Sequence, residues 1–301
     1  MLSRRVEKAI SDPRRALDHL LWLGRKNLAL ERYVGGKKFF YSTPQIRSVS
    51  DDGVYISFAA RAASDPATFA TFRSHSAYRR ILEHVSESEG RGYLDEITTH
   101  SPALLEKIED LKGNDLVGGP ITFAYDGVGA VSPTTLRYIK VAGDLQSYFG
   151  SDIGVKIVEI GIGYGGQMRI LDRLHSFKEY HLYDLPPVLA LATRYLESFV
   201  LRGSYRALTL NQNAGDESYD LAISNYAFSE LPVLLQRVYI EKILSRSKRG
   251  YLTMNSGLRG SAYVDDKLSL SELRELLPSF EVFQEVPLTR SDNYVIVWGH
   301  K

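Results

Sequence analysis

The chain has 301 residues, of which 44% are hydrophobic and 24% charged, and its formal net charge is +1. These values exclude a largely disordered chain and leave room for one large domain or two smaller ones. A near-zero net charge without a basic block gives no basis for a nucleic-acid partner. The absence of cysteine excludes disulfides and thiolate metal sites, and no apolar run is long enough to cross a bilayer. We therefore expect a cytoplasmic protein without membrane insertion.

The first third of the sequence has a mainly helical pattern. Residues 11–34 (SDPRRALDHLLWLGRKNLALERYV) and 64–85 (SDPATFATFRSHSAYRRILEHV) combine helical spacing of apolar residues with a Ser-Asp-Pro start. Residues 113–132 are rich in Gly and Pro and predict an ordered loop or a short hairpin. We place a domain boundary there. Residues 1–115 would form a helical region that covers an acceptor site or mediates oligomerisation, and residues 116–301 the second domain.

The second domain begins with a predicted helix over 133–149, with Ser132 as its cap, Pro133 at its first position and Gly150 at its end. Strands and helices then alternate. The predicted strands are 155–161, 179–185, 205–210, 219–225, 249–255, 280–287 and 293–300, and the helices between them are 165–174, 186–199, 231–246 and 268–278. Such alternation indicates a mostly parallel sheet covered on both faces. The last two strands are predicted to form an antiparallel pair, and this ending resembles the Rossmann-like α/β fold of class I methyltransferases.

The segment EIGIGYGG links the first strand of this domain to its helix. A glycine turn at this position brings backbone close to a ligand and directs the helix N–H groups towards it. Gly161, Gly163 and Gly166 satisfy G-x-G-x-x-G, whereas Glu159, Gly161, Gly163 and Gly165 satisfy E-x-G-x-G-x-G. The glycine spacing alone is therefore compatible with a dinucleotide enzyme, with a methyltransferase, or with glycines that serve only a tight turn.

Three features favour S-adenosylmethionine as the ligand. Glu159 is a carboxylate at the end of an apolar strand, where it would repel a pyrophosphate but attract the sulfonium and ammonium of S-adenosylmethionine. Asp184 ends the next strand, where a carboxylate accepts hydrogen bonds from ribose hydroxyls. Because NAD enzymes share this feature, it favours a nucleoside cofactor but does not distinguish NAD from S-adenosylmethionine. The turn follows half of the chain, and the domain ends in the predicted antiparallel pair. These features predict a methyltransferase and disfavour a dinucleotide enzyme.

Six segments, SPTTLRYIKVAGDL, EIGIGYGGQ, YDLPPV, SNYAFSELP, RGYLTMN and NYVIVWG, together resemble the sugar O-methyltransferase family. The resemblance covers about residues 113–301. It implies an enzyme that transfers a methyl group from S-adenosylmethionine to a sugar hydroxyl of a polysaccharide, a nucleotide sugar or a glycosylated natural product. The alternatives are a methyltransferase with a non-sugar acceptor and a noncatalytic subunit that binds the cofactor. A homo-oligomer is left open.

The resemblance implies that Glu159, Gly161, Gly163 and Asp184 bind the cofactor. Further candidates follow from their positions in the turn, on the preceding helix and at the strand ends: Arg137, Tyr164, Gly165, Gln167, Leu185, Asn211, Asn225 and Tyr226. For Arg137 the alternative is a solvated helix face. For Asn211 the alternative is a simple turn.

Methyl transfer to a sugar hydroxyl calls for a base, because the hydroxyl is a very weak acid. Glu230 follows the fourth predicted strand and is one candidate, although a carboxylate at a helix start is also favoured by the helix dipole. His100 and Asp126, both in predicted loops, are the others. The sequence contains no compact set of metal ligands, so a divalent metal is open but not indicated.

Overall fold

A computed structural model describes residues 53–212, 216–255, 267–290 and 293–300. The chain divides into two compact units, Met1–Ser48 and Val49–Lys301, and the second is described here by itself. The predicted helical segment 11–34 lies outside the described residues.

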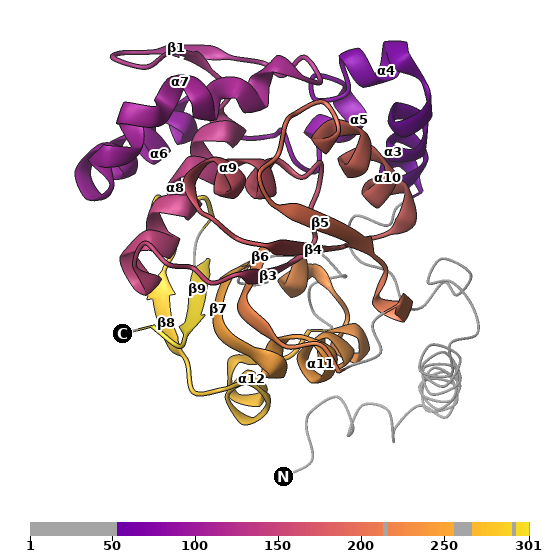
Figure 1. Cartoon of the computed structure of the whole chain (residues 1–301), viewed down its shortest axis with the longest axis vertical. Coiled ribbons are helices and arrows are strands. Elements are labelled where there is room, and N and C mark those ends of the chain that lie inside the picture. The colour runs from indigo at the N-terminus through magenta and orange to yellow at the C-terminus, as the bar shows by residue number, and fades with distance from the viewer. Residues whose placement is uncertain (1–52, 213–215, 256–266, 291–292, 301) are drawn as a thin grey trace, which may run out of the picture. The chain divides into compact units, whose positions relative to one another are not determined.

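A seven-stranded sheet forms the centre of this unit (Figure 1). Its strands lie in the order β5-β4-β3-β6-β7-β9-β8. The first five are parallel, and β9 is antiparallel to both β7 and β8. The strand bounds are β3 Lys156–Ile160, β4 Glu179–Tyr183, β5 Ser204–Leu208, β6 Tyr219–Asn225, β7 Ser247–Met254, β8 Glu281–Gln284 and β9 Tyr294–Trp298. The predicted methyltransferase-type sheet with a C-terminal antiparallel pair is confirmed.

The centre of the sheet explains where a ligand would bind. The chain moves outward from β3 to β4 and β5 on one side, and from β6 to β7 on the other. The connections therefore diverge between β3 and β6, which are neighbours. In open α/β sheets this switch point, at the carboxyl ends of the strands, is where ligands bind.

Helices cover both faces of the sheet. Figure 1 shows α8 (Pro133–Phe149), α9 (Gly166–Leu174) and α10 (Pro186–Leu196) on one face, and α11 (Val233–Lys242) and α12 (Leu270–Leu276) on the other. The predicted start of α8 is confirmed, because the Ser132 side chain accepts from the Thr135 amide and Pro133 occupies the first turn. Helix α12 begins with a capping box, in which the Ser269 side chain accepts from the Glu272 amide and the Glu272 side chain accepts from the Ser269 amide.

The segment before the sheet consists of short helices. These are α3 (Val54–Ser64), α4 (Pro66–Ala70), α5 (Ser76–Arg79), α6 (Glu87–His100) and α7 (Ile108–Leu111), with 3₁₀ turns η2 (Pro102–Lys107) and η3 (Lys112–Leu116). Helix α3 packs on α10, and α6 packs on α8. A hairpin of β1 (Phe123–Tyr125) and β2 (Gly129–Val131) follows, as the Gly- and Pro-rich segment predicts.

The predicted helix over 64–85 is broken into α4 and α5. Asp65 caps α4 as expected, since its carboxylate accepts from the Thr68 amide at 2.7 Å. The helix ends at Thr71, whose φ of −133° and ψ of 17° are not helical. This break turns the Arg73 side chain inward, where it is fully buried and paired with Glu83 and Asp115.

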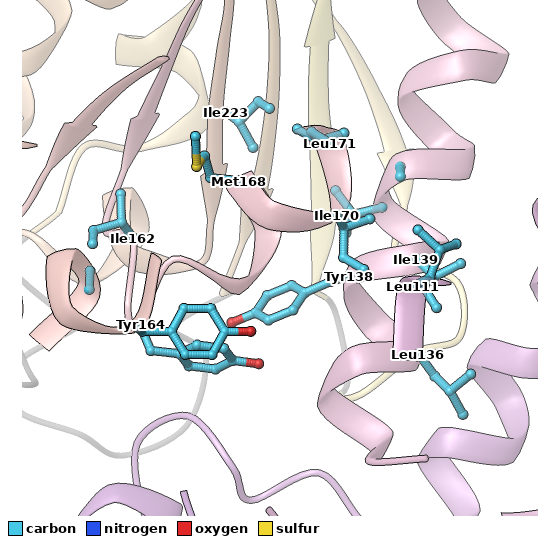
Figure 2. Close-up of a cluster of buried hydrophobic side chains, with 14 of the residues drawn as sticks. Leu111, Leu136, Tyr138, Ile139, Ile162, Tyr164, Met168, Ile170, Leu171 and Ile223 are labelled. Atoms are coloured by element: carbon cyan, nitrogen blue, oxygen red, sulfur yellow. The ribbon is translucent and has the colours of Figure 1, made fainter. Parts of the chain in front are cut away.

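These helices share one hydrophobic cluster with the sheet domain. Figure 2 shows part of that cluster, in which Leu111 lies among side chains of α8 and α9. The domain boundary at 115/116 stays a prediction. Among the described residues, none of the helices combines the length and the apolar character that a membrane crossing requires.

Candidate functional site

The turn between β3 and α9 is built from glycines in the left-handed region. Gly161, Gly163 and Gly165 have φ values of 77°, 54° and 88°. A Cβ atom on Gly161 would lie 1.9 Å from the Cβ of Ala227, so a side chain is excluded there. The Gly161 amide donates to the carbonyl of Tyr183 at 2.9 Å. The predicted glycine turn is thus a close-packed backbone structure next to β4 and the end of β6.

Asp184, directly after β4, fixes this turn. Its Oδ2 accepts from the Ile162 amide at 3.0 Å, and its Oδ1 accepts from the Leu185 amide at 2.7 Å. Burial raises the pKa of Asp184 to about 7, although these backbone hydrogen bonds lower it. The predicted ribose-binding carboxylate therefore lies against the glycine turn and orients it.

Glu159 lies inside the sheet on β3 and is 2% exposed. Its Oε2 accepts from the Tyr180 hydroxyl at 2.8 Å. Burial raises its pKa to about 8, and the hydrogen bond from Tyr180 only partly offsets this. No Lys, Arg or His side chain among the described residues forms an ion pair with Glu159. A positively charged ligand would favour the ionised form of this carboxylate, so the site fits a cationic group.

The Tyr164 side chain anchors the turn to the core. Its ring is fully buried and packs edge-on against Tyr195, with centroids 4.7 Å apart, and against Tyr138 at 5.9 Å. Figure 2 shows the rings of Tyr164 and Tyr138 next to one another. The Arg73 guanidinium lies 4.5 Å from the centroid of the Tyr164 ring. The structure gives this side chain a packing role, and its contact with a cofactor stays a prediction.

Gln167 and Asn225 connect three elements beneath the site. The Gln167 amide nitrogen donates to the Tyr138 carbonyl at 3.1 Å, and its oxygen accepts from the Asn225 amide at 3.3 Å. These bonds join α8, α9 and the carboxyl end of β6. The Oδ1 atom of Asn225 is buried and has no hydrogen-bond partner among the described residues. The cofactor contacts predicted for both residues stay predictions.

Arg137, in the first half of α8, is 6% exposed, which excludes the solvated helix face as its environment. Its Nη2 donates to the carbonyl of Leu82 at 3.3 Å, and its Nε has no hydrogen-bond partner among the described residues. The guanidinium lies 5.6 Å from the ring centroid of Tyr138 and 5.8 Å from that of Tyr226. Arg137 is thus a buried cation beside the end of β6.

Sequence reasoning did not identify Leu82, which covers the glycine turn. A Cβ atom on Gly163 would lie 2.8 Å from the Leu82 Cδ1 atom. The neighbouring Glu83 is held by Arg73 at 2.6 Å. The sequence indicates this contact only indirectly. The helical segment breaks after α4, and the break brings Leu82 and Glu83 back over the glycine turn.

Glu230 ends the 3₁₀ turn η5 (Ala227–Glu230). Its Oε1 accepts from the side-chain amide nitrogen of Asn255 at 3.0 Å, and the Lys267 ammonium donates to the backbone carbonyl of Asn255. Burial raises the pKa of Glu230 and lowers the pKa of Lys267. Burial raises the pKa of Tyr55 in α3, and the charges of Asp184 and, more weakly, of Glu230 raise it further. Asn255, Lys267 and Tyr55 were not predicted.

His100 and Asp126 lie apart from Glu230. His100 ends α6 with an exposed side chain whose Nε2 is 3.6 Å from Glu96. The adjacent Ser101 contacts α8 at Gly143, six residues beyond Arg137. Asp126 is exposed in the turn of the β1–β2 hairpin. The structure shows no contact between either side chain and the described residues of the glycine turn.

Asn211 lies beyond the end of its predicted strand. Strand β5 ends at Leu208, and Asn211 is exposed in the 3₁₀ turn η4 (Leu210–Gln212). The Gln212 side chain accepts from the Thr209 amide at 2.7 Å and closes this turn. Within the described part of the chain, no group of three or more His, Asp or Glu residues is arranged to hold a metal ion.

Comparisons with known proteins give only distant structural similarities. No family model and no curated protein matches the chain. Among solved structures it is similar to magnesium protoporphyrin IX methyltransferase (ChlM) from Synechocystis PCC 6803 with bound SAM, at 16% identity over 54% of this chain and 76% of that chain, with a TM-score of 0.41. It is also similar to a SAM-dependent methyltransferase from Aquifex aeolicus, at 16% identity over 64% and 96% of the two chains and a TM-score of 0.40. The methyltransferase domain of bacterial CtHen1 gives 16% identity, 54% and 96% coverage and a TM-score of 0.40.

Proposed function

We propose that this protein is an S-adenosylmethionine-dependent O-methyltransferase that acts on a sugar hydroxyl. The observation that carries the cofactor assignment is Glu159, a buried carboxylate without a described cationic partner, beside a glycine turn that Asp184 orients. S-adenosylmethionine supplies an activated methyl group and carries a sulfonium and an ammonium. A pyrophosphate would be repelled at the same position, which disfavours a dinucleotide.

Different residues of the site are proposed to bind different parts of S-adenosylmethionine. Glu159 attracts its positive charge, Arg137 pairs with its carboxylate, and Asp184 accepts from its ribose hydroxyls. The other proposed contacts come from the glycine turn and the strand ends, namely Gly161, Gly163, Tyr164, Gly165, Gln167, Leu185, Asn211, Asn225 and Tyr226. The buried position of Arg137 supports its role, since its Nε has no described hydrogen-bond partner.

The acceptor side lies at the ends of β6 and β7. The sugar assignment is supported by the motif resemblance, above all by SNYAFSELP, which ends at the turn that carries Glu230. Glu230 is proposed as a base, and burial raises its pKa, which favours the uptake of a proton. His100 and Asp126 stay sequence predictions, as do the covering role of residues 1–115 and the cytoplasmic location.

Calorimetry with S-adenosylmethionine, S-adenosylhomocysteine and NADH tests the cofactor assignment. We expect micromolar binding of the two sulfur ligands, none of NADH, and loss of binding in Asp184→Ala. Asp95→Ala removes an exposed carboxylate on α6 and is the matched control, expected to bind as wild type does. A folded wild type that binds neither sulfur ligand would overturn the proposal.

A panel of nucleotide sugars, glycans, phenols and carboxylates then tests the acceptor. Transfer of a radiolabelled methyl group to a sugar alone would support the sugar assignment. Transfer only to phenols or carboxylates would replace it with a non-sugar acceptor. Cofactor binding without transfer to any acceptor would favour a noncatalytic subunit.

A further inference from the structure

Tyr226, the first residue after β6, has a strained backbone. Its φ of 68° makes it the one non-glycine residue in the left-handed region among the described residues. A side chain with a Cβ atom disfavours this conformation, and such strain persists where the surrounding structure imposes it, often at functional sites. Tyr226 lies at the carboxyl edge of the sheet, next to Asn225 and one residue before Ala227, which contacts Gly161. The strain therefore lies within the proposed active site.

The Tyr226 hydroxyl donates to Oε1 of Glu285, in the link between β8 and β9. Glu285 is 5% exposed. Its Oε2 accepts from the Thr289 amide at 3.2 Å, from the Thr289 hydroxyl at 2.7 Å and from the Asn293 side chain at 3.1 Å. All four donors are neutral, and no Lys, Arg or His side chain among the described residues forms an ion pair with Glu285. The carboxylate is held in place by hydrogen bonds from neutral groups.

The groups around Tyr226 come from three elements. Glu285 approaches from the β8–β9 link, Tyr93 from α6, and Arg137 from α8 with its guanidinium 5.8 Å from the Tyr226 ring. Burial raises the pKa of Tyr226 above its ordinary value. The phenol therefore keeps its own proton, and it can take up another only by passing its own to a neighbour. Glu285 is the neighbour to which the hydroxyl is already bonded.

We propose that Tyr226 and Glu285 form a proton relay for the acceptor hydroxyl; this rests on the proposed function. The acceptor O–H bond breaks, and its proton bonds to Oη of Tyr226 while the Tyr226 proton passes to Oε1 of Glu285. The electron pair left on the acceptor oxygen forms the bond to the methyl carbon, and the pair of the broken methyl–sulfur bond stays on sulfur. Tyr226 is then a catalytic residue, and Glu285 is the positioning residue that receives the proton.

Glu230 and Glu285 differ in their hydrogen-bond partners. Glu230 accepts from the side-chain amide of Asn255, and the charges of Arg290 and Lys267 favour its ionised form, although burial opposes it. Glu285 accepts from the hydroxyl of Tyr226, as well as from Thr289 and Asn293. Of the two carboxylates, Glu285 is the one that a phenol at the end of β6 donates to, so the two candidates make different predictions.

The first test needs no cofactor. Incorporation of 3-fluorotyrosine at position 226 allows the ¹⁹F resonance to be followed against pH in the wild-type background and in Glu285→Gln. We expect the resonance to differ between the two backgrounds, because Glu285→Gln replaces the carboxylate that accepts from the Tyr226 hydroxyl. Tyr251, whose hydroxyl donates to Asp144 at 2.5 Å, is a second buried tyrosine–carboxylate pair and the matched control. A position-226 resonance that is the same in both backgrounds at every pH would overturn the relay.

The second test uses methyl transfer with an acceptor from the panel above. General-base groups typically contribute roughly 10²- to 10⁴-fold, so Tyr226→Phe should lower kcat by at least about 100-fold. Its Kd for S-adenosylmethionine should stay within about twofold, because the ring and backbone remain. Glu285→Gln should lower kcat similarly and change the pH–rate profile. Tyr251→Phe should retain kcat and that profile.

The outcomes separate the relay from the proposed function. A wild type that fails to bind S-adenosylmethionine overturns both. A wild type that binds and turns over, with a Tyr226→Phe variant of nearly equal kcat and unchanged pH profile, overturns the relay alone and leaves Glu230 as the base. Thermal melts check folding, and if Tyr226→Phe does not fold, the fluorine titration of Glu285→Gln decides.

Discussion

The neighbouring strands β3 and β6 end differently, although the residue that follows each strand has a positive φ. After β3 the residue is Gly161, with φ 77°, and after β6 it is Tyr226, with φ 68°. At Gly161 no side chain fits, because the Ala227 Cβ already fills the position that a Cβ atom would take. At Tyr226 the side chain is retained despite the strain and bonds to Glu285.

Under the proposed function this difference gives the two strand ends distinct tasks. The end of β3 presents closely packed backbone and one buried carboxylate, which we propose bind the cofactor. The end of β6 presents polar side chains held by loops from the C-terminal part of the sheet, which we propose transfer the proton. Changes on the β3 side should therefore alter stability and cofactor affinity, and changes on the β6 side should alter turnover.

The largest effect is expected beneath the β3 turn, at Arg73. Its side chain is fully buried, pairs with Glu83 at 2.6 Å and Asp115 at 3.0 Å, and stacks on Tyr164 of the turn. Removing one partner of a buried ionic group typically costs about 3–5 kcal/mol. Arg73→Met should lower the free energy of unfolding by about this amount in urea titrations.

A surface ion pair provides the control for Arg73. Arg206 is half exposed and lies 3.4 Å from Glu217, and such pairs contribute about 0.2–1 kcal/mol. Arg206→Met should therefore have a small effect. Equal losses for the two variants would mean that the turn does not depend on the buried network.

Gly161→Ala tests the β3 turn itself. The positive φ would cost the added Cβ about 1–2 kcal/mol, and its contact with Ala227 about 1–3 kcal/mol. We expect a loss of about 2–5 kcal/mol in the free energy of unfolding, with loss of cofactor binding.

Gly127→Ala separates the two causes. Gly127 has φ 75° in the β1–β2 turn, and nothing lies within 4 Å of the position of its added Cβ. Gly127→Ala should lower the free energy of unfolding only by what the positive φ costs, about 1–2 kcal/mol, and it should keep cofactor binding. A Gly161→Ala protein as stable as Gly127→Ala would show that Ala227 can move aside.

The sequence predicted the β3 side better than the β6 side. Glu159, Asp184 and the glycines lie at strand ends that local alternation already reveals, and the capping residue Ser132 marks the start of α8. Their environment follows from sheet topology, which alternation of strands and helices dictates. For that reason the fold and the position of the turn could be predicted.

The residues that complete the site could not be predicted, because their partners are distant in sequence. Leu82 reaches Gly163 only because α4 ends at Thr71. Glu285 resembles any acidic residue of a polar link, but it is buried and accepts a hydrogen bond from Tyr226, 59 positions away. Local patterns contain no information on such contacts.

Glu159→Gln should weaken cofactor binding without unfolding the protein. The amide keeps the shape and can still accept from Tyr180, but it loses the negative charge that a cationic ligand requires. Hydrogen bonds to charged groups contribute about 1.5–3 kcal/mol, so the Kd for S-adenosylmethionine should rise roughly 10- to 100-fold in calorimetry. A Kd equal to that of wild type would remove Glu159 from the site.

The same variant should change the pH dependence of stability. In the folded wild type the Glu159 carboxyl keeps its proton up to about pH 8. In the unfolded chain the same carboxyl loses its proton near its ordinary pKa of 4.5. Between these values the folded state binds more protons, so stability falls as pH rises, by up to about 1.4 kcal/mol per pH unit. Glu159→Gln should lack this slope in denaturation curves measured from pH 5 to 8. A slope identical to that of wild type would contradict the assignment.

The smallest effect on cofactor affinity is expected at Glu230. Its carboxylate is bound to Asn255 at the end of β7 and has no described hydrogen bond to the glycine turn or to Asp184. Glu230→Gln should therefore leave the Kd for S-adenosylmethionine within about twofold of wild type, whereas Glu159→Gln weakens it at least about tenfold. If the two variants lose affinity equally, the separation into a binding side at β3 and a proton-transfer side at β6 fails. If Glu230→Gln keeps affinity but loses more turnover than Glu285→Gln, the separation holds and the proton passes to Glu230.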